Sequence, residues 1–262
     1  MGGLKMKVII LGSGSYSGTP KPLCTCENCT RARINPAFRR TRFSVYIEGG
    51  ILIDPGPDLH YHLEKLNKEV ETILITHAHF DHIFGLPDAQ VFKKLTIASN
   101  PLGIKVARSL AMLAFNSEAP LGNDWDYVEL KFWNEYKVNG VKVIHFPVVH
   151  SIEMAGGFLI ERKNKTVAIT GDTGPEIIRD SEVIDLIKGS DLLISEMTHK
   201  ESIPKTHLGV NDAIELAKIV KAEQTVFAHI SHSNYPQEIL EKKVREAKIS
   251  GIVARDFTII EI

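Results

Sequence analysis

Short apolar runs, separated by Gly, Pro and Asp, recur along the whole chain and predict buried strands. They occupy residues 8–11, 44–47, 51–53, 73–76, 95–98, 141–146, 158–161, 167–170, 192–195, 226–228 and 257–262. Apolar residues at helical spacing predict helices over residues 59–66, 102–115, 177–187, 210–220 and 236–247. This alternation favours a layered α/β architecture in which helices cover two sheets. No repeat or linker divides the chain, so we expect a single domain over residues 1–262.

The composition is that of an ordinary globular protein, with 44% hydrophobic and 24% charged residues. The net charge of −1 argues against a partner nucleic acid bound through overall positive potential. No apolar segment is long enough to cross a bilayer, and the run at residues 8–11 is too short for a signal peptide. We therefore expect a cytoplasmic protein with no membrane partner.

Four side chains that could bind a metal ion follow the predicted strand at residues 73–76. They are His77, His79, Asp81 and His82, and they fall within six residues of a chain that has 11 histidines. Imidazole and carboxylate groups are the ligands that zinc, manganese and iron take in proteins. A loop that leaves a buried strand can point the first two side chains one way and the last two another. The cluster predicts a metal site.

All three cysteines, Cys24, Cys26 and Cys29, also lie within six residues. An odd number packed so tightly is a poor disulfide framework and is typical of part of a metal site. Three thiolates need a fourth ligand to complete a tetrahedral zinc site, and His232 is the candidate. A four-cysteine iron–sulfur cluster cannot be built from this chain. A redox-active or simply reduced cysteine cluster is the alternative.

The motif His77-x-His79-x-Asp81-His82 resembles the signature of the metallo-β-lactamase superfamily. The rest of that family's pattern follows in order at strand ends: Asp54, His150, Asp172 and His229. The resemblance implies an αββα four-layer sandwich. It also implies that one metal ion is held by His77, His79 and His150, that the other is held by Asp81, His82 and His229, and that Asp172 bridges them. Zinc β-lactamases with a cysteine at the position of Asp172 are excluded, because no cysteine follows Cys29.

The pattern Cys24-x-Cys26-x-x-Cys29, together with His229-x-x-His232, resembles the PhnP group of this superfamily. That group contains a phosphodiesterase that opens cyclic phosphates of ribose. The resemblance implies a structural zinc held by Cys24, Cys26, Cys29 and His232, in an insert over about residues 20–42, and a catalytic pair of zinc or manganese ions. It also implies that His207 contacts the phosphate or protonates the leaving group, with Glu196 orienting it. The alternative for His207 is an ordinary surface histidine.

The expected reaction is hydrolysis of a small-molecule phosphodiester, such as a cyclic ribose phosphate or a cyclic nucleotide, by a hydroxide that bridges the metal ions. Asp81 would orient this nucleophile as well as bind metal. One alternative is an endonuclease for the 3′ end of tRNA, although no long basic Gly/Pro-rich insertion for gripping tRNA is visible. Another is a non-catalytic carrier like the pyrroloquinoline-quinone biosynthesis relative, whose kin tend to lose ligands that this chain keeps. A thioesterase or lactonase is a third.

The basic run at Arg31, Arg33, Arg39, Arg40 and Arg42 is a solvated face, a phosphate clamp or an RNA contact. The remaining histidines in predicted helices, strands or loops, His60, His62, His145 and His199, are expected to be exposed. A homodimer is compatible with all of these expectations.

Overall fold

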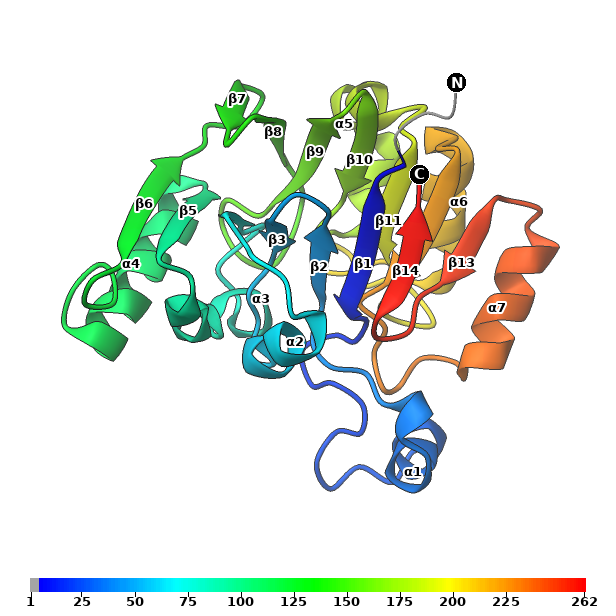
Figure 1. The fold of residues 1–262 in the computed structure, drawn as a ribbon. Coiled ribbons are helices and arrows are strands. Elements are labelled where there is room, and N and C mark those ends of the chain that lie inside the picture. The colour runs from blue at the N-terminus through cyan, green and yellow to red at the C-terminus, as the bar shows by residue number, and fades with distance from the viewer. Residues whose placement is uncertain (1–4) are drawn as a thin grey trace.

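The computed structural model describes residues 5–262, which form two seven-stranded sheets (Figure 1). The first sheet contains β1 (Lys7–Gly12), β2 (Ser44–Ile47), β3 (Ile51–Ile53), β4 (Thr72–Leu74), β5 (Lys94–Ser99), β6 (Asp124–Glu129) and β14 (Thr258–Glu261). The second contains β7 (Glu135–Val138), β8 (Val141–Pro147), β9 (Gly156–Arg162), β10 (Lys165–Ile169), β11 (Leu192–Glu196), β12 (Gln224–Ala228) and β13 (Gly251–Val253). Their strand orders are β14-β1-β2-β3-β4-β5-β6 and β13-β12-β11-β10-β9-β8-β7.

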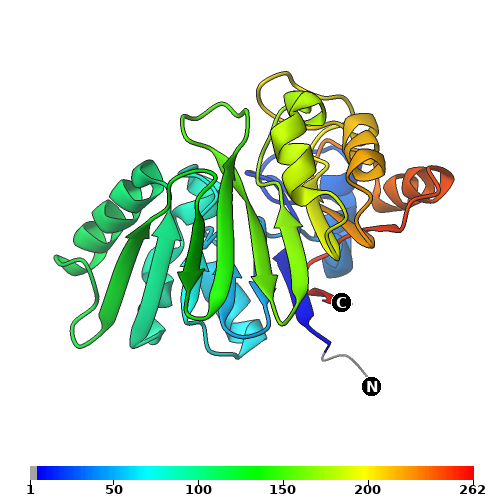
Figure 2. The same ribbon diagram turned by 90° about the horizontal axis from the view of Figure 1, so that it is seen from above.

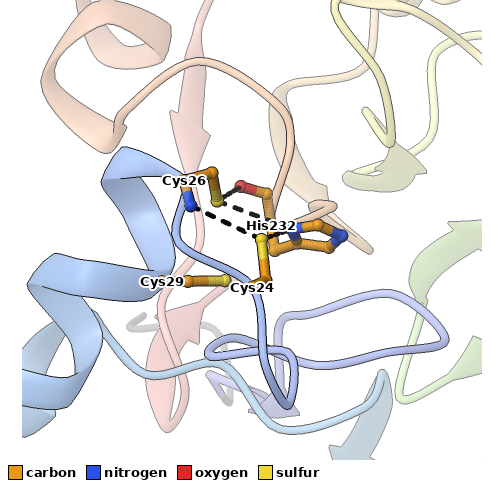
Figure 3. A group of neighbouring side chains, drawn as sticks. All are labelled: Cys24, Cys26, Cys29 and His232. Carbon is orange, nitrogen blue, oxygen red and sulfur yellow. Dashed lines mark hydrogen bonds between the residues drawn. The ribbon is translucent and has the colours of Figure 1, made fainter.

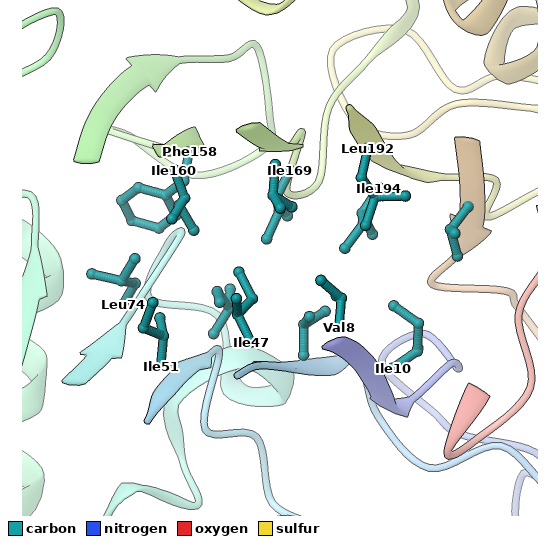
Figure 4. Close-up of a cluster of buried hydrophobic side chains, with 14 of the residues drawn as sticks. Val8, Ile10, Ile47, Ile51, Leu74, Phe158, Ile160, Ile169, Leu192 and Ile194 are labelled. Carbon is teal, nitrogen blue, oxygen red and sulfur yellow. The ribbon is translucent and has the colours of Figure 1, made fainter. Parts of the chain in front are cut away.

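The two sheets pack face to face because each strand places alternate side chains on opposite faces. In β1, Val8 and Ile10 enter the apolar cluster between the sheets, whereas Leu11 packs on the other face. In β11, Ile194 enters the central cluster and Leu193 packs away from it. Figure 4 shows the two rows of aliphatic side chains meeting. The central core is therefore a buried apolar layer that fixes the spacing of the sheets.

Helices form the two outer layers (Figure 2). On the outer face of the first sheet lie α2 (Leu59–Leu66) and α4 (Pro101–Phe115). On the outer face of the second lie α5 (Ser181–Ile187), α6 (Val210–Val220) and α7 (Gln237–Glu246). This order of layers confirms the predicted αββα sandwich. Within residues 5–262, no helix is both long and apolar enough to cross a membrane.

The apolar runs did not predict β6, β7, β13, α1 (Glu27–Ile34) or the single turn α3 (Phe80–Ile83). The edge strand β6 alternates acidic residues with Trp125 and Tyr127, so it contains no continuous apolar run. Helix α1 buries only Cys29 and Ala32. The predicted helix over residues 177–187 is instead a 3₁₀ turn followed by α5. The division falls at Asp180, whose side chain accepts a hydrogen bond from the Val183 amide and so starts α5.

Two histidines that we expected at the surface are buried, so that expectation was wrong for them. His62 turns inward from α2, and its Nε2 lies 2.8 Å from Thr41 Oγ1. His145, in β8, lies against the ring of Phe158 at a centroid distance of 4.5 Å. Burial lowers the pKa of His62 to about 4 and that of His145 to about 3, so both rings are neutral at pH 7. His60 is exposed and His199 half-buried.

Parallel strands bring polar residues to one end of both sheets. Strands β3 to β6 run parallel in the first sheet, and β10 to β13 run parallel in the second. The carboxyl ends of such strands are where α/β proteins place ligands. Asp54 follows β3 and His229 follows β12, with φ of 57° and 54° respectively. Backbone in this left-handed region is strained for residues other than glycine, and such strain is typical of functional positions.

Candidate metal centre

Seven His and Asp side chains meet between the carboxyl ends of the two sheets in two groups. The ligand atoms within each group all lie within 4.8 Å of one another. One group is His77, His79 and His150, and the other is Asp81, His82, Asp172 and His229. These are the sets that the resemblance assigns to two metal ions. The structure thus brings the predicted side chains together, while their binding of metal stays a prediction.

In the first group, three ring nitrogens point at one another. His150 Nδ1 donates to the carbonyl oxygen of Thr206 at 2.6 Å, so in the neutral ring Nε2 carries a lone pair. That Nε2 lies 3.1 Å from His79 Nδ1, and His77 Nε2 lies 3.1 Å from the same atom. The Thr76 hydroxyl donates to Asp54, so its oxygen accepts from His77 Nδ1 and the neutral ring of His77 also has a lone pair on Nε2. His79 Nδ1 carries at most one proton, so it cannot donate to both neighbours. A cation among the three nitrogens removes the conflict, so this group fits a metal ion.

In the second group, hydrogen bonds fix which nitrogen is free. His82 Nδ1 donates to Asp54 Oδ2 at 2.8 Å, which leaves Nε2 buried with no hydrogen-bond partner among the described residues. The Thr198 hydroxyl donates to Glu196, so its oxygen accepts from His229 Nδ1 at 2.9 Å. His229 Nε2 therefore also presents a lone pair. Ligand histidines oriented through their second nitrogen are typical of protein metal sites.

Asp172 stands between the two groups. Its Oδ2 lies 3.8 Å from both His77 Nε2 and His150 Nε2, and its Oδ1 lies 3.3 Å from His229 Nε2. Burial alone would raise the pKa of Asp172, but positive charge on the rings of His229 and His82 outweighs burial and holds that pKa well below its ordinary value. A bound cation would take the place of this positive charge when the two rings are neutral and present their lone pairs. Asp172 is therefore a carboxylate that faces both groups, the position a bridging ligand needs.

His207 and Glu196 form a pair at the edge of the centre. His207 Nδ1 lies 3.1 Å from Glu196 Oε2, and Glu196 also accepts from the amide of Thr173. Burial opposes charge on His207, but its hydrogen bond to Glu196 and the charge of that carboxylate raise the pKa of His207 to about 9. Burial also opposes the charged form of Glu196 and therefore raises its pKa, whereas the hydrogen bond from His207 lowers that pKa. The structure places Glu196 within hydrogen-bonding distance of His207, while the roles that the resemblance implies for the two residues stay predictions.

The three cysteines and His232 form a second cluster, which we call the knuckle (Figure 3). Cys24 Sγ lies 3.5 Å and Cys26 Sγ 3.6 Å from His232 Nδ1. The hydrogen bond from the Cys26 amide lowers the pKa of Cys24, whereas burial raises that of Cys29 to about 12. A cation beside Cys29 would favour its thiolate form. Three sulfurs and one imidazole in this arrangement are consistent with a tetrahedral metal site.

The arginines of the basic run at residues 31–42 form hydrogen bonds within the knuckle insert and to the C-terminal part of the chain. Arg31 pairs with Glu238 at 3.0 Å, and Arg33 donates to the carbonyl of Lys21 at 2.9 Å. Arg40 donates to the carbonyl of Ala254 at 2.7 Å. Arg39 and Arg42 donate to protein groups as well. These guanidinium groups are therefore engaged within the protein.

Sequence reasoning missed Thr198 and the carbonyl of Thr206, which orient His229 and His150. No period or spacing marks either residue, because each contact joins two strand-end loops that are distant along the chain. It also missed Phe43, whose ring centroid lies 6.2 Å from those of His82 and His229. The predicted strand at residues 44–47 begins one residue after Phe43 and so did not include it.

Comparison with known proteins identifies the family. Residues 50–230, more than half of the chain, match the beta-lactamase superfamily domain. The chain therefore belongs to the metallo-β-lactamase superfamily, as its signature motif indicated. Among curated relatives, a metal-dependent hydrolase from Christiangramia forsetii is 27% identical over 71% of this chain and 78% of its own length. Ribonuclease Z from Archaeoglobus fulgidus is 23% identical over 87% of this chain and 94% of its own.

Solved structures show the same fold. A diphosphatase from the PhnP family superposes with a TM-score of 0.81 at 22% identity, covering 99% of this chain and 98% of its own. Zinc-bound PqqB from Methylobacterium extorquens gives 0.80 at 18% identity, covering 98% and 100%. At these identities the likeness establishes the fold and leaves the activity open.

The hydrogen bond from His82 to Asp54 yields the first prediction. Asp54→Asn replaces the carboxylate with an amide, which balances less of the charge on a metal-bound imidazole and can present a donor to Nδ1. We expect metal affinity to fall roughly 10- to 100-fold while the fold persists. Competition with a chromophoric chelator measures the affinity. Asp58→Asn, the same change at an aspartate that pairs with Arg42, is the control. Unchanged affinity in Asp54→Asn would contradict the orienting role.

Proposed function

We propose that this protein is a metal-dependent hydrolase that cleaves a small-molecule phosphodiester, such as a cyclic ribose phosphate or a cyclic nucleotide. The observation that carries the proposal is the pair of ligand groups joined by Asp172, with His207 held by Glu196 beside them. The name of the C. forsetii relative supports the hydrolase class, and the PhnP-family neighbour supports phosphorus chemistry.

The two groups would hold two divalent cations, with His77, His79 and His150 on one, Asp81, His82 and His229 on the other, and Asp172 on both. Zinc or manganese suits these nitrogen and oxygen donors. Bound there, such cations supply Lewis acidity that activates water and neutralises phosphoryl charge. Asp81 Oδ2 lies 3.3 Å from His229 Nε2, so this carboxylate would bind the same cation, and it can also accept a hydrogen bond from an attacking water.

His207 supplies the proton that leaves with the product. Its Nδ1 is engaged by Glu196, so Nε2 is the atom that exchanges a proton with a bound substrate. Its side chain is 17% exposed, whereas that of Glu196 is 1% exposed, so the histidine reaches the ligand and the carboxylate stays behind it. Glu196 holds the ring in one orientation and stabilises its charged form. Protonation of the leaving oxygen at the edge of the centre completes the hydrolysis.

The function is tested by offering several substrate classes to one metal-saturated sample. We expect turnover of a bis-aryl phosphodiester and of cyclic phosphates, and no cleavage of precursor tRNA or of an acyl thioester. Asp172→Ala should abolish turnover, because the carboxylate that faces both groups is lost. Cleavage of precursor tRNA alone would favour the endonuclease. Thioester turnover alone would favour a thioesterase, and metal-saturated protein that acts on none of these substrates would favour the carrier.

His207→Ala should lower kcat by roughly 10²–10⁴, the usual range for losing a general acid. Metal content, measured by elemental analysis, should not change. The loss should be smaller for phosphodiesters with activated aryl leaving groups, which depart with little protonation. An equal loss for activated and unactivated esters would indicate that His207 only binds phosphate. His60→Ala, at an exposed histidine on α2, is the matched control.

We also propose that the knuckle binds a structural zinc. Its ligands lie about 200 residues apart in sequence, so the ion would restrict the unfolded chain strongly. His232→Ala should release one zinc per chain and lower the melting temperature by roughly 10 °C, while the folded fraction keeps its activity. His229→Ala, three residues away, should remove activity with a smaller thermal effect. If thermal melts and kinetic assays instead showed that His229→Ala mainly lowers the melting temperature and that His232→Ala mainly removes activity, the assignment of these two histidines to the two metal sites would be reversed.

A further inference from the structure

The metal centre opens on one side. Five of its side chains, His77, Asp81, His82, Asp172 and His229, are buried, and the side chain of His150 is only 1% exposed, whereas His79 is partly exposed. A ligand therefore enters past the loop that carries His79. Next to that residue lies Phe80, a large aromatic side chain that is 38% exposed.

Phe80 belongs to a cluster of three exposed aromatic rings, which we call the aromatic platform. Its members are Tyr16, Phe80 and Phe84, of which Tyr16 is 61% and Phe84 45% exposed. The centroids of Phe80 and Phe84 are 4.9 Å apart, and those of Tyr16 and Phe80 are 5.8 Å apart. Contiguous exposed apolar rings beside a site mark a place where something binds.

The aromatic platform is attached to both ligand groups. Phe80 stands between His79 and Asp81 and begins α3, whose next three residues are buried. Phe84 follows one turn later. Tyr16 comes from the opposite side: the neighbouring amide of Ser15 donates to the carbonyl of Ile230, the residue after His229. The three rings thus lie along the rim that joins the His79 loop to the His229 loop.

The protein also holds Tyr16 in place. Arg42 Nε donates to the Tyr16 carbonyl at 3.2 Å, and the Arg42 guanidinium pairs with Asp58 at 3.2 Å. The backbone amide of Arg42 donates to Asp58 as well, at 2.8 Å. A ring whose backbone is fixed before a ligand arrives loses little conformational entropy on binding.

We propose that the aromatic platform stacks a planar heteroaromatic ring of the substrate, so that the phosphodiester is a nucleotide and not a base-free sugar phosphate. This inference rests on the proposed function and narrows its substrate class. Stacking on aromatic side chains tolerates any nucleobase, because every base presents a π face. The platform therefore selects for the presence of a base and discriminates little among bases.

The first test measures binding of a product and needs no turnover. Isothermal titration of metal-loaded protein with AMP and with ribose 5-phosphate compares ligands that differ by the base. We expect AMP to bind more tightly, and Tyr16→Ala and Phe84→Ala each to weaken AMP roughly 5- to 100-fold without changing ribose 5-phosphate. Tyr16→Phe should retain the wild-type affinity, because it keeps the ring.

Tyr61→Ala is the matched control, since Tyr61 is 45% exposed but packs against Phe257. It should change neither affinity. Equal binding of AMP and ribose 5-phosphate by the wild type would overturn the platform. So would unchanged AMP affinity in Tyr16→Ala and Phe84→Ala, which would leave the rings to another occupant such as a protein partner.

Kinetics then separate this inference from the proposed function. A cyclic nucleotide and the base-free cyclic glycerophosphate are compared in wild type and Tyr16→Ala. We expect Tyr16→Ala to raise KM for the nucleotide only, with kcat little changed. Equal kcat/KM for both substrates, insensitive to Tyr16→Ala, would overturn the platform and leave the hydrolase standing. Platform-dependent AMP binding without hydrolysis of either phosphodiester would overturn the proposed function and leave the platform standing.

Discussion

The metal centre depends on one electrostatic constraint: lone pairs and carboxylates are buried together where the two sheets end. His82 Nε2 and His229 Nε2 face Asp172 at 3.3 Å, and both rings are aimed by hydrogen bonds from their other nitrogen. Buried anions and unpartnered nitrogens are costly unless a cation compensates them. The protein preserves this arrangement by holding every ring in one orientation, at the expense of strained backbone at Asp54 and His229.

The packing of the sheets makes that arrangement rigid. The aliphatic layer between them fixes the separation of the strand ends, so the loops that carry Asp54 and Asp172 meet at a constant distance. The result is a precise cluster on short loops, each anchored to a buried strand. His79 and His207 remain partly accessible at its edge.

One C-terminal loop connects the metal centre to the knuckle. His229 and His232 stand three residues apart, and Asn234 beyond them donates to the carbonyls of Met197 and Thr198. Asn28, in α1, donates to the carbonyl of His232 at 3.1 Å. The same short segment is thus fixed from the strand β11 side and from the knuckle side. This explains why an insert near the N-terminus contributes to the position of a ligand near the C-terminus.

The amino-acid sequence was enough to predict the strands of the central core and the seven side chains that meet at the candidate metal centre. The strands at residues 44–47 and 192–195 are continuous apolar runs, because both of their faces are buried. The ligands stand at strand ends in a motif that local spacing preserves, as in His77-x-His79. Elements without such a signal, β6 and α1, escaped prediction because their positions depend on what packs against them.

Which residues hydrogen-bond to the histidines of the candidate metal centre, and which other histidines are buried, became apparent from the folded structure alone. Thr198 contacts both Glu196 and His229 because parallel β11 and β12 end side by side, and His62 is buried because Thr41 meets it from another loop. The aromatic platform likewise joins Tyr16 to Phe80 across more than sixty residues. Such contacts arise between segments that share no local pattern, so neither hydrophobic periodicity nor a sequence motif indicates them.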